Sequence, residues 1–195
     1  MTAVLKRIAG VCGIISQLIG LAALLVTISR SPWFNWTENY ISVLGVEGSA
    51  AMIFNWGLIL TGALSLIFAI GLGKDILSSR WGQLGKASLM LGSIAFSAMG
   101  IFPRTTDTPH NCASLAFFVF ITLAILLIGI TAMTTSQKKW GVLSVIVVTL
   151  IVVFQLAPCP WDGGALPQLL SCLPWSLWTI IFGVRLLVRS SPIEV

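Results

Sequence analysis

The chain has 195 residues, of which 57% are hydrophobic and only 9% are charged, which is too little charge for a soluble domain. Its formal net charge of +5 does not indicate nucleic-acid binding, because the basic residues form short clusters beside apolar runs instead of a stripe on a water-facing domain. Several of those runs are long enough to cross a bilayer. The composition therefore predicts one all-α membrane domain over residues 1–195.

The first predicted span covers about residues 8–28 and follows Lys6 and Arg7. This run is longer than the apolar region of a typical signal peptide and no small-x-small cleavage site follows it, so we expect an uncleaved span. Residues 29–49 then mix aromatic rings with polar side chains, a combination that is typical of the headgroup level of a membrane. We expect this segment to lie along the outer surface as a short helix or loop. Its Asn35-Trp36-Thr37 triplet also fits the N-glycosylation pattern.

The remaining apolar runs predict five further spans, at about 52–72, 85–102, 113–133, 141–157 and 169–188. The sequence thus predicts a polytopic bundle of six transmembrane helices. Pro174 is expected in the first turns of the last span, where the loss of a backbone N–H costs least. All Lys and Arg residues except Arg30 and Arg104 fall on one side of this threading. The bias of basic residues toward the cytoplasm predicts that both termini are cytoplasmic and that the chain lies in the cell membrane.

Polar side chains gather at the outer ends of the predicted spans. The turn at residues 100–111 contains Arg104, Asp107 and His110, the only histidine of the chain. Other outer stretches add Glu38, Asn39, Ser42, Asn55, Gln155 and Gln168. We interpret these residues, together with Arg104 and His110, as a ligand-binding pocket at the outer leaflet, because Arg recognises anionic groups and a histidine ring can exchange a proton near neutral pH. The alternative is that these loops are polar because they face water.

Metal, haem and catalytic-triad sites are not indicated. One histidine cannot supply a bis-His haem, the cysteines form no compact ligand motif, and no nucleophile has a local signature. We therefore expect no cofactor. His110 and Asp107 are the candidate catalytic residues, because their separation can bring an acid–base pair together at the start of a helix.

Two further features concern thiols and the interior of the spans. Cys159 and Cys172 flank the last outer turn and are the simplest disulfide candidate, since the outer compartment permits such bonds. No ionisable residue lies in the middle of a span, which argues against a pump or an ion-coupled carrier. Gln17 and Ser65 are expected to form hydrogen bonds between helices, and the Ser93-x-x-x-Ser97 spacing favours close helix packing.

Four motifs carry a resemblance to a known family: NYISVLG at 39–45, FNWGLILTG at 54–62, GIFP at 100–103, and His110 followed by ASLAFF at 113–118. In this order they resemble the prokaryotic six-span membrane family called domain of unknown function 998 (DUF998), over roughly residues 8–188. The order is also similar to the eukaryotic Frag1/DRAM/Sfk1 group, some members of which are linked to remodelling or distribution of membrane lipids. The resemblance implies a six-span architecture. It also implies that five positions deserve examination as functional residues: Ser42, Gly45, Asn55, Pro103 and His110. Members often have a basic residue just before the last span, where this chain has Gln168-Leu169.

Three functions fit these observations. The first is a protein that binds or handles a membrane lipid or other amphiphile at the outer leaflet, with Arg104 and His110 near its headgroup. The second is a membrane-embedded enzyme that modifies a lipid or isoprenoid with Asp107 and His110 as the acid–base pair. The third is a homo-oligomer or a structural subunit of a larger membrane complex. The uncharged interior and the polar outer rim favour the first.

Overall fold

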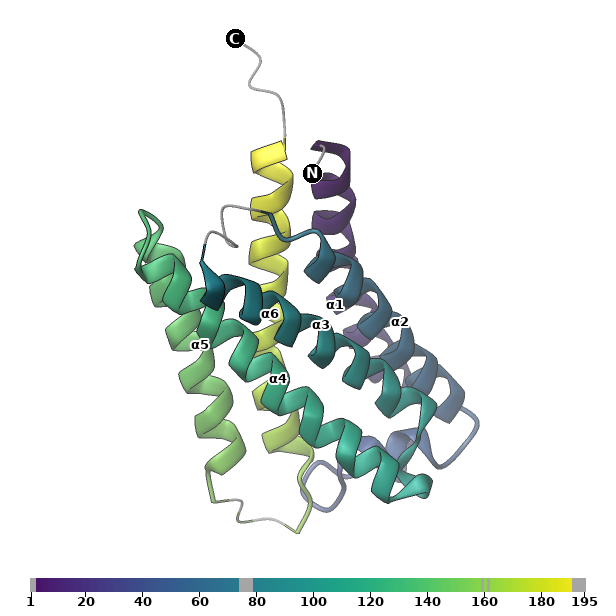
Figure 1. Ribbon diagram of the computed structural model, residues 1–195. Coiled ribbons are helices and arrows are strands. Elements are labelled where there is room, and N and C mark those ends of the chain that lie inside the picture. Colours follow the sequence, from purple (N-terminus) through teal and green to yellow (C-terminus); the bar gives the residue numbers. More distant parts are fainter. Residues whose placement is uncertain (1–2, 74–78, 159, 161, 191–195) are drawn as a thin grey trace.

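The computed structural model describes residues 3–73, 79–158, 160 and 162–190, and six long helices run through these residues (Figure 1). They are α1 (Ala3–Ser29), α2 (Ala51–Ile70), α3 (Arg80–Ile101), α4 (Thr108–Met133), α5 (Lys138–Leu156) and α6 (Ala165–Ser190). Two short 3-10 helices, η1 (Ile41–Gly45) and η2 (Arg104–Thr106), lie between them. Each long helix is apolar and long enough to span a membrane, so the predicted all-α, six-span, multi-pass fold is confirmed.

Most helices extend beyond the predicted spans, because the apolar pattern marks only the part that crosses hydrocarbon. For example, α3 begins at Arg80, where the hydroxyl oxygen of Ser79 accepts a hydrogen bond from the Gly82 amide at 3.1 Å and caps the helix. At the start of α4, Pro109 occupies the first turn, where its missing N–H is tolerated. Local features of the first turn, a serine cap in α3 and a proline in α4, therefore favour starts ahead of the apolar runs.

The placement of Pro174 differs from the prediction. Helix α6 begins at Ala165, ahead of the predicted start at 169, so Pro174 lies in the interior of the helix. At this position proline has no N–H to donate to the carbonyl of Leu170. Interior prolines are tolerated more readily in membrane helices, because neighbouring groups can compensate for the lost hydrogen bond.

The six helices form a closed ring. Each packs against the next along the chain, and α6 also packs against α1. The start of α1 and the end of α6 lie at the same end of the bundle, which we call the basic end because it carries Lys6, Arg7, Lys138, Lys139 and Arg189 (Figure 1). The opposite end, which we call the His110 end, carries η1, η2 and the connection between α5 and α6. The ring thus gathers the polar turns of the sequence at one end.

Small residues allow these helices to approach closely. A Cβ added at Gly62 of α2 would lie 2.6 Å from the Ser93 carbonyl and 2.6 Å from the Ser97 amide nitrogen of α3. The Ser97 hydroxyl donates to the Ile59 carbonyl across the same interface at 3.0 Å. The close packing indicated by the Ser93–Ser97 spacing therefore occurs between α2 and α3. Because lipid tails are as apolar as leucine, such contacts carry much of the association between membrane helices.

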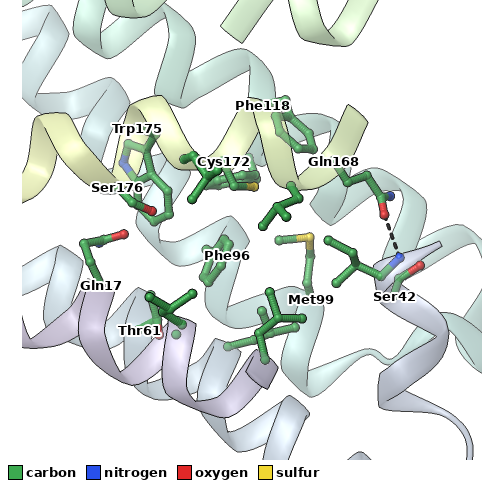
Figure 2. Close-up of a pocket in the computed structure, with 18 of the residues that line it drawn as sticks. Gln17, Ser42, Thr61, Phe96, Met99, Phe118, Gln168, Cys172, Trp175 and Ser176 are labelled. Carbon is green, nitrogen blue, oxygen red and sulfur yellow. Dashed lines mark hydrogen bonds between the residues drawn. The ribbon is translucent and has the colours of Figure 1, made fainter. Parts of the chain in front are cut away.

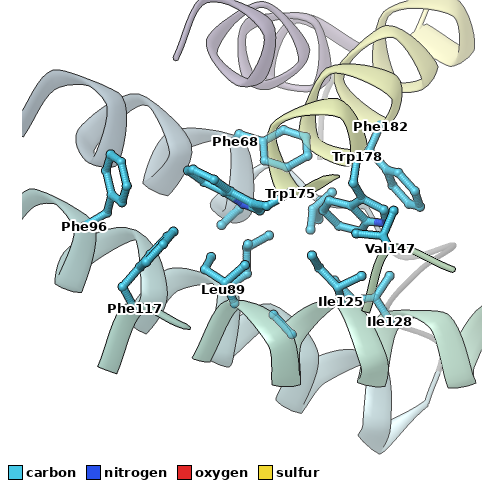
Figure 3. Packing of buried hydrophobic residues seen from close by; sticks show 14 of the residues in the cluster. Phe68, Leu89, Phe96, Phe117, Ile125, Ile128, Val147, Trp175, Trp178 and Phe182 are labelled. Atoms are coloured by element: carbon cyan, nitrogen blue, oxygen red, sulfur yellow. The ribbon is translucent and has the colours of Figure 1, made fainter. Parts of the chain in front are cut away.

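Aromatic side chains fill the interior of the helix bundle toward its basic end (Figure 3). The Trp178 ring is fully buried, stacks on Phe182 with centroids 4.1 Å apart, and meets Phe68 edge-on at 6.4 Å. Its indole N–H donates to the Ser144 hydroxyl at 2.9 Å, so its polar group is satisfied. Phe96, Phe117 and Trp175 continue this aromatic cluster as far as the cavity described below.

The segment between α1 and α2 lies on the surface of the His110 end only in part. Trp33 and Tyr40 are exposed, as the aromatic pattern predicts. However, η1 turns inward and packs against α2 and α6, and its Leu44 is completely buried. Burial of this leucine removes apolar surface from water, which favours the inward turn.

Candidate functional site

A cavity of about 330 Å³ lies inside the His110 end of the bundle (Figure 2). Helices α1, α2, α3, α4 and α6 and the short helix η1 enclose it, whereas no described residue of α5 lines it. Its volume is at the lower end of the range of about 300–1,000 Å³ found for small-molecule sites. Most of its lining side chains are apolar, so its interior suits hydrocarbon better than a polar solute.

Three aromatic residues, Phe96, Phe117 and Trp175, form the floor of the cavity. They come from α3, α4 and α6, and their ring centroids lie 4.7 to 5.3 Å apart. Contacts of this kind between rings stabilise by about 0.5–1.5 kcal/mol beyond area burial. The floor is therefore held together by ring contacts among three helices.

Three polar side chains line the cavity at the His110 end, which we call its mouth: Ser42 of η1, His110 of α4 and Gln168 of α6. We call these three side chains the polar rim. The Gln168 amide oxygen accepts a hydrogen bond from the Ile41 amide at 2.8 Å (Figure 2). This bond joins the start of η1 to the start of α6, two segments far apart in sequence. It thereby fixes one edge of the mouth.

Arg104 lies beside this mouth. Its Nη1 donates to the Ser42 hydroxyl at 3.3 Å, and its guanidinium carbon lies 4.8 Å from the centre of the Tyr40 ring. Stacking on an aromatic face orients a guanidinium group and leaves its edge available for hydrogen bonds. The arginine thus places a positive charge next to the polar rim.

The His110 side chain is 5% exposed, and its Nδ1 lies 2.8 Å from the Phe102 carbonyl oxygen. A carbonyl oxygen can only accept, so Nδ1 carries the hydrogen of this bond, and in the neutral ring Nε2 is an acceptor. The bond also fastens the first turn of α4 to the end of α3. His110 therefore has one nitrogen used in the fold, and its side chain also lines the cavity.

A family model described as "Protein of unknown function (DUF998)" matches residues 14–185, which is most of the chain. The chain belongs to this family. Neither a curated protein nor a solved structure matches it. The family resemblance carried by the four sequence motifs is therefore confirmed, whereas the likeness to the Frag1/DRAM/Sfk1 group stays a prediction.

The remaining ligand-binding candidates of the DUF998 chain do not line the cavity. The Asn55 amide nitrogen donates to the Gly45 carbonyl at 2.9 Å and holds η1 against α2. The side-chain oxygen of Asn39 accepts from the Asn35 amide at 2.7 Å, and its backbone carbonyl accepts from the Ala165 amide at 2.9 Å. These two asparagines therefore shape the mouth without lining it. Glu38 and Gln155 are exposed and are not among the lining residues.

Asp107 and His110 have different partners. The Asp107 carboxylate accepts a hydrogen bond from the Asn111 side chain at 3.1 Å, and Asp107 itself is exposed and has a φ of 51°. Non-glycine residues with positive φ are uncommon, although Asp is among those that tolerate it best. The carboxylate thus stays within the turn before α4, while the histidine ring packs inward onto the Phe102 carbonyl.

The disulfide candidate can be followed for one partner, because Cys159 lies outside the described residues. Cys172 has a free thiol and lines the cavity. Cys112 is also free and is exposed in the first turn of α4. Among the described residues, no three His, Cys, Asp or Glu side chains form a group that could hold a metal ion.

Sequence reasoning did not assign the polar side chains that line the cavity from within the helices, which are Gln17, Thr61, Ser114 and Ser176. The sequence predicts a hydrogen bond between helices for Gln17, and its amide nitrogen lies 3.4 Å from the Ser65 hydroxyl of α2. The same nitrogen donates to the Ser16 hydroxyl at 2.9 Å. Figure 2 shows the remaining amide oxygen of Gln17 directed toward the cavity. The sequence does contain one signal for this part of the cavity, because Gln17 is a single amide in the middle of an apolar helix.

Proposed function

We propose that this DUF998 protein binds a membrane lipid or similar amphiphile in the cavity, at the outer leaflet. The observation that carries the proposal is an apolar cavity within a membrane-spanning bundle, with polar side chains from three separate segments gathered at its mouth. The apolar part of the ligand packs against the aromatic floor. Its polar head lies at the rim formed by Ser42, His110 and Gln168.

Two groups, one beside the polar rim and one within it, can recognise the headgroup of the lipid. The Arg104 guanidinium supplies a fixed positive charge with several N–H donors, which suits a phosphate or carboxylate headgroup. The His110 Nε2 supplies an acceptor for a hydroxyl or amine of the same headgroup. An anionic head that also carries a hydrogen-bond donor matches both.

The geometry favours binding over acid–base catalysis. A catalytic pair requires a base within hydrogen-bond reach of its partner or of the substrate proton. The Asp107 carboxylate is bonded to Asn111 on the exposed turn, and His110 is bonded to the Phe102 carbonyl. His110 is therefore oriented by a backbone group and not by a carboxylate, which suits a binding residue.

We also propose that the basic end of the bundle faces the cytoplasm and that the protein resides in the cell membrane, as the charge bias favours. Cys112 reports on this orientation, because it is exposed at the His110 end. In a variant whose other three cysteines are alanine, a membrane-impermeant maleimide should label Cys112 in intact cells. Lys139→Cys, in a chain whose four native cysteines are alanine, should react only after permeabilisation because Lys139 is exposed at the basic end. The reverse pattern would invert the proposed topology.

Native mass spectrometry of the protein released gently from its own membrane tests lipid binding. We expect a lipid-sized adduct on the wild type, with occupancy lowered about tenfold or more in Arg104→Ala, because hydrogen bonds to charged groups contribute about 1.5–3 kcal/mol. Arg30→Ala is the matched control, since Arg30 is exposed at the same end and does not line the cavity.

A wild-type protein that carries no adduct would contradict tight lipid binding. Equal losses in Arg104→Ala and Arg30→Ala would show that the arginine acts through overall charge instead of through the rim. A heavier mass of fixed stoichiometry would instead indicate a homo-oligomer or a subunit of a membrane complex.

A further inference from the structure

Resting on the proposed function, we infer that the cavity takes one hydrocarbon chain of a membrane lipid, and that this chain enters sideways from the bilayer between α1 and α6. We call this entrance the α1–α6 seam and define it by Leu18 and Leu21 of α1 and Leu173 and Leu177 of α6. The lipid headgroup remains at the polar rim while the chain passes through the seam.

The four seam leucines each face both the cavity and the outside of the bundle. All of them line the cavity, yet their exposed fractions are 54% for Leu18, 45% for Leu21, 45% for Leu173 and 56% for Leu177. A side chain can do both only where the wall is a single side chain thick. Nothing larger than these leucines therefore separates the cavity from the surrounding lipid at the seam.

The packing of α1 against α6 explains why the wall is thin there. The two helices approach each other closely nearer the basic end, where a Cβ added at Gly10 would lie 2.7 Å from the Gly183 carbonyl oxygen. From this crossing they separate toward the His110 end (Figure 1). Helices α1 and α6 are also the first and last of the ring, so this is the neighbouring pair that no direct loop connects.

The size and chemistry of the cavity identify the occupant as one chain. A volume of about 330 Å³ is at the small end of ligand sites, too small for the two chains and headgroup of a whole bilayer lipid. A chain that moves from the bilayer through a leucine-lined gap into an apolar cavity stays in apolar surroundings throughout. No apolar surface has to cross water, so the sideways route avoids the cost of exposing hydrocarbon to water.

Photolabelling in nanodiscs tests the entrance. The probe is phosphatidylglycerol with a diazirine on one acyl chain, and the readout is label on Met99, which lines the cavity from α3 and is 8% exposed. We expect Met99 to be labelled in the wild type. The labelling rate should fall at least fivefold in Leu21→Trp and in Leu173→Trp, because the larger ring narrows the seam.

Matched controls separate a blocked entrance from a general effect of tryptophan. Val26 of α1 and Val184 of α6 are exposed to a similar degree but do not line the cavity, so Val26→Trp and Val184→Trp should label Met99 at the wild-type rate. Leu21→Ala and Leu173→Ala widen the seam and should raise the rate. These alanine variants also keep the test decisive if a tryptophan variant does not fold.

The outcomes distinguish the two proposals. If Met99 is labelled in the wild type and the rate is unchanged in all seam variants, a chain binds but enters elsewhere, which overturns the α1–α6 entrance and leaves the proposed function standing. If the wild type shows no label on Met99, no lipid chain occupies the cavity, and the proposed function fails together with its entrance.

Discussion

Replacing Gly62 with valine is expected to cost about 3 kcal/mol or more of stability, the largest effect we predict for a single substitution in the bundle. A side chain at this position meets two backbone atoms of α3, the Ser93 carbonyl oxygen and the Ser97 amide nitrogen, and backbone cannot move aside as a flexible side chain can. Overpacking typically costs about 1–3 kcal/mol. Separation of α2 from α3 would also break the hydrogen bond from Ser97 to the Ile59 carbonyl.

Thermal unfolding in detergent, followed by tryptophan fluorescence, measures this loss. The control is Ala63→Val, which introduces the same side chain at the next residue, where the helix is exposed. We expect a fall in Tm of roughly 6 °C or more for Gly62→Val, since about 1 kcal/mol corresponds to 2–4 °C in a chain of this size. The control should change little. Equal shifts in both variants would mean that valine acts through helix propensity and not through the α2–α3 contact.

Replacing His110 with alanine is expected to reduce both stability and ligand binding. The substitution removes the hydrogen bond to the Phe102 carbonyl and leaves that carbonyl without this donor, at a cost of about 1–3 kcal/mol. It also removes the Nε2 acceptor from the cavity, which should weaken binding by about tenfold. The measurements are Tm and the occupancy of the lipid adduct.

His110→Asn separates these two roles. The asparagine amide nitrogen can occupy the place of Nδ1 and donate to the Phe102 carbonyl, but it does not reach the position of Nε2. We therefore expect Tm close to that of the wild type together with weakened adduct formation. Full binding by His110→Asn would show that Nε2 does not contact the ligand and that His110 serves the fold alone.

The six spans could be predicted because their cause is local. A helix that crosses a bilayer must be apolar over a length set by the membrane, and this property can be read from the residues of one segment. The helix boundaries could not be read in the same way, as α6 and its Pro174 show, because residues that extend a helix beyond the hydrocarbon do not alter the apolar pattern. The family match over residues 14–185 agrees with the order of motifs along the chain.

The candidate site was predicted only in part. Ser42, His110 and Gln168 were identified because they are polar residues beside apolar spans, and the structure places all three at the cavity. Gln155 has the same sequence character, yet it lies on α5, which contributes no described residue to the lining. Sequence position gives the depth of a residue in the membrane, but it does not give the direction in which its helix presents that residue.

The sequence by itself determined that this is a six-span membrane protein of the DUF998 family and that its polar turns lie at defined ends. Only the tertiary structure decided that a cavity exists and which residues line it. The cavity depends on contacts between segments distant in the chain, such as Ile41 with Gln168 and Gly10 with Gly183. Because a helix position appears equally apolar whether it faces lipid, a neighbouring helix or an empty cavity, the packing of all six helices is needed to distinguish these environments.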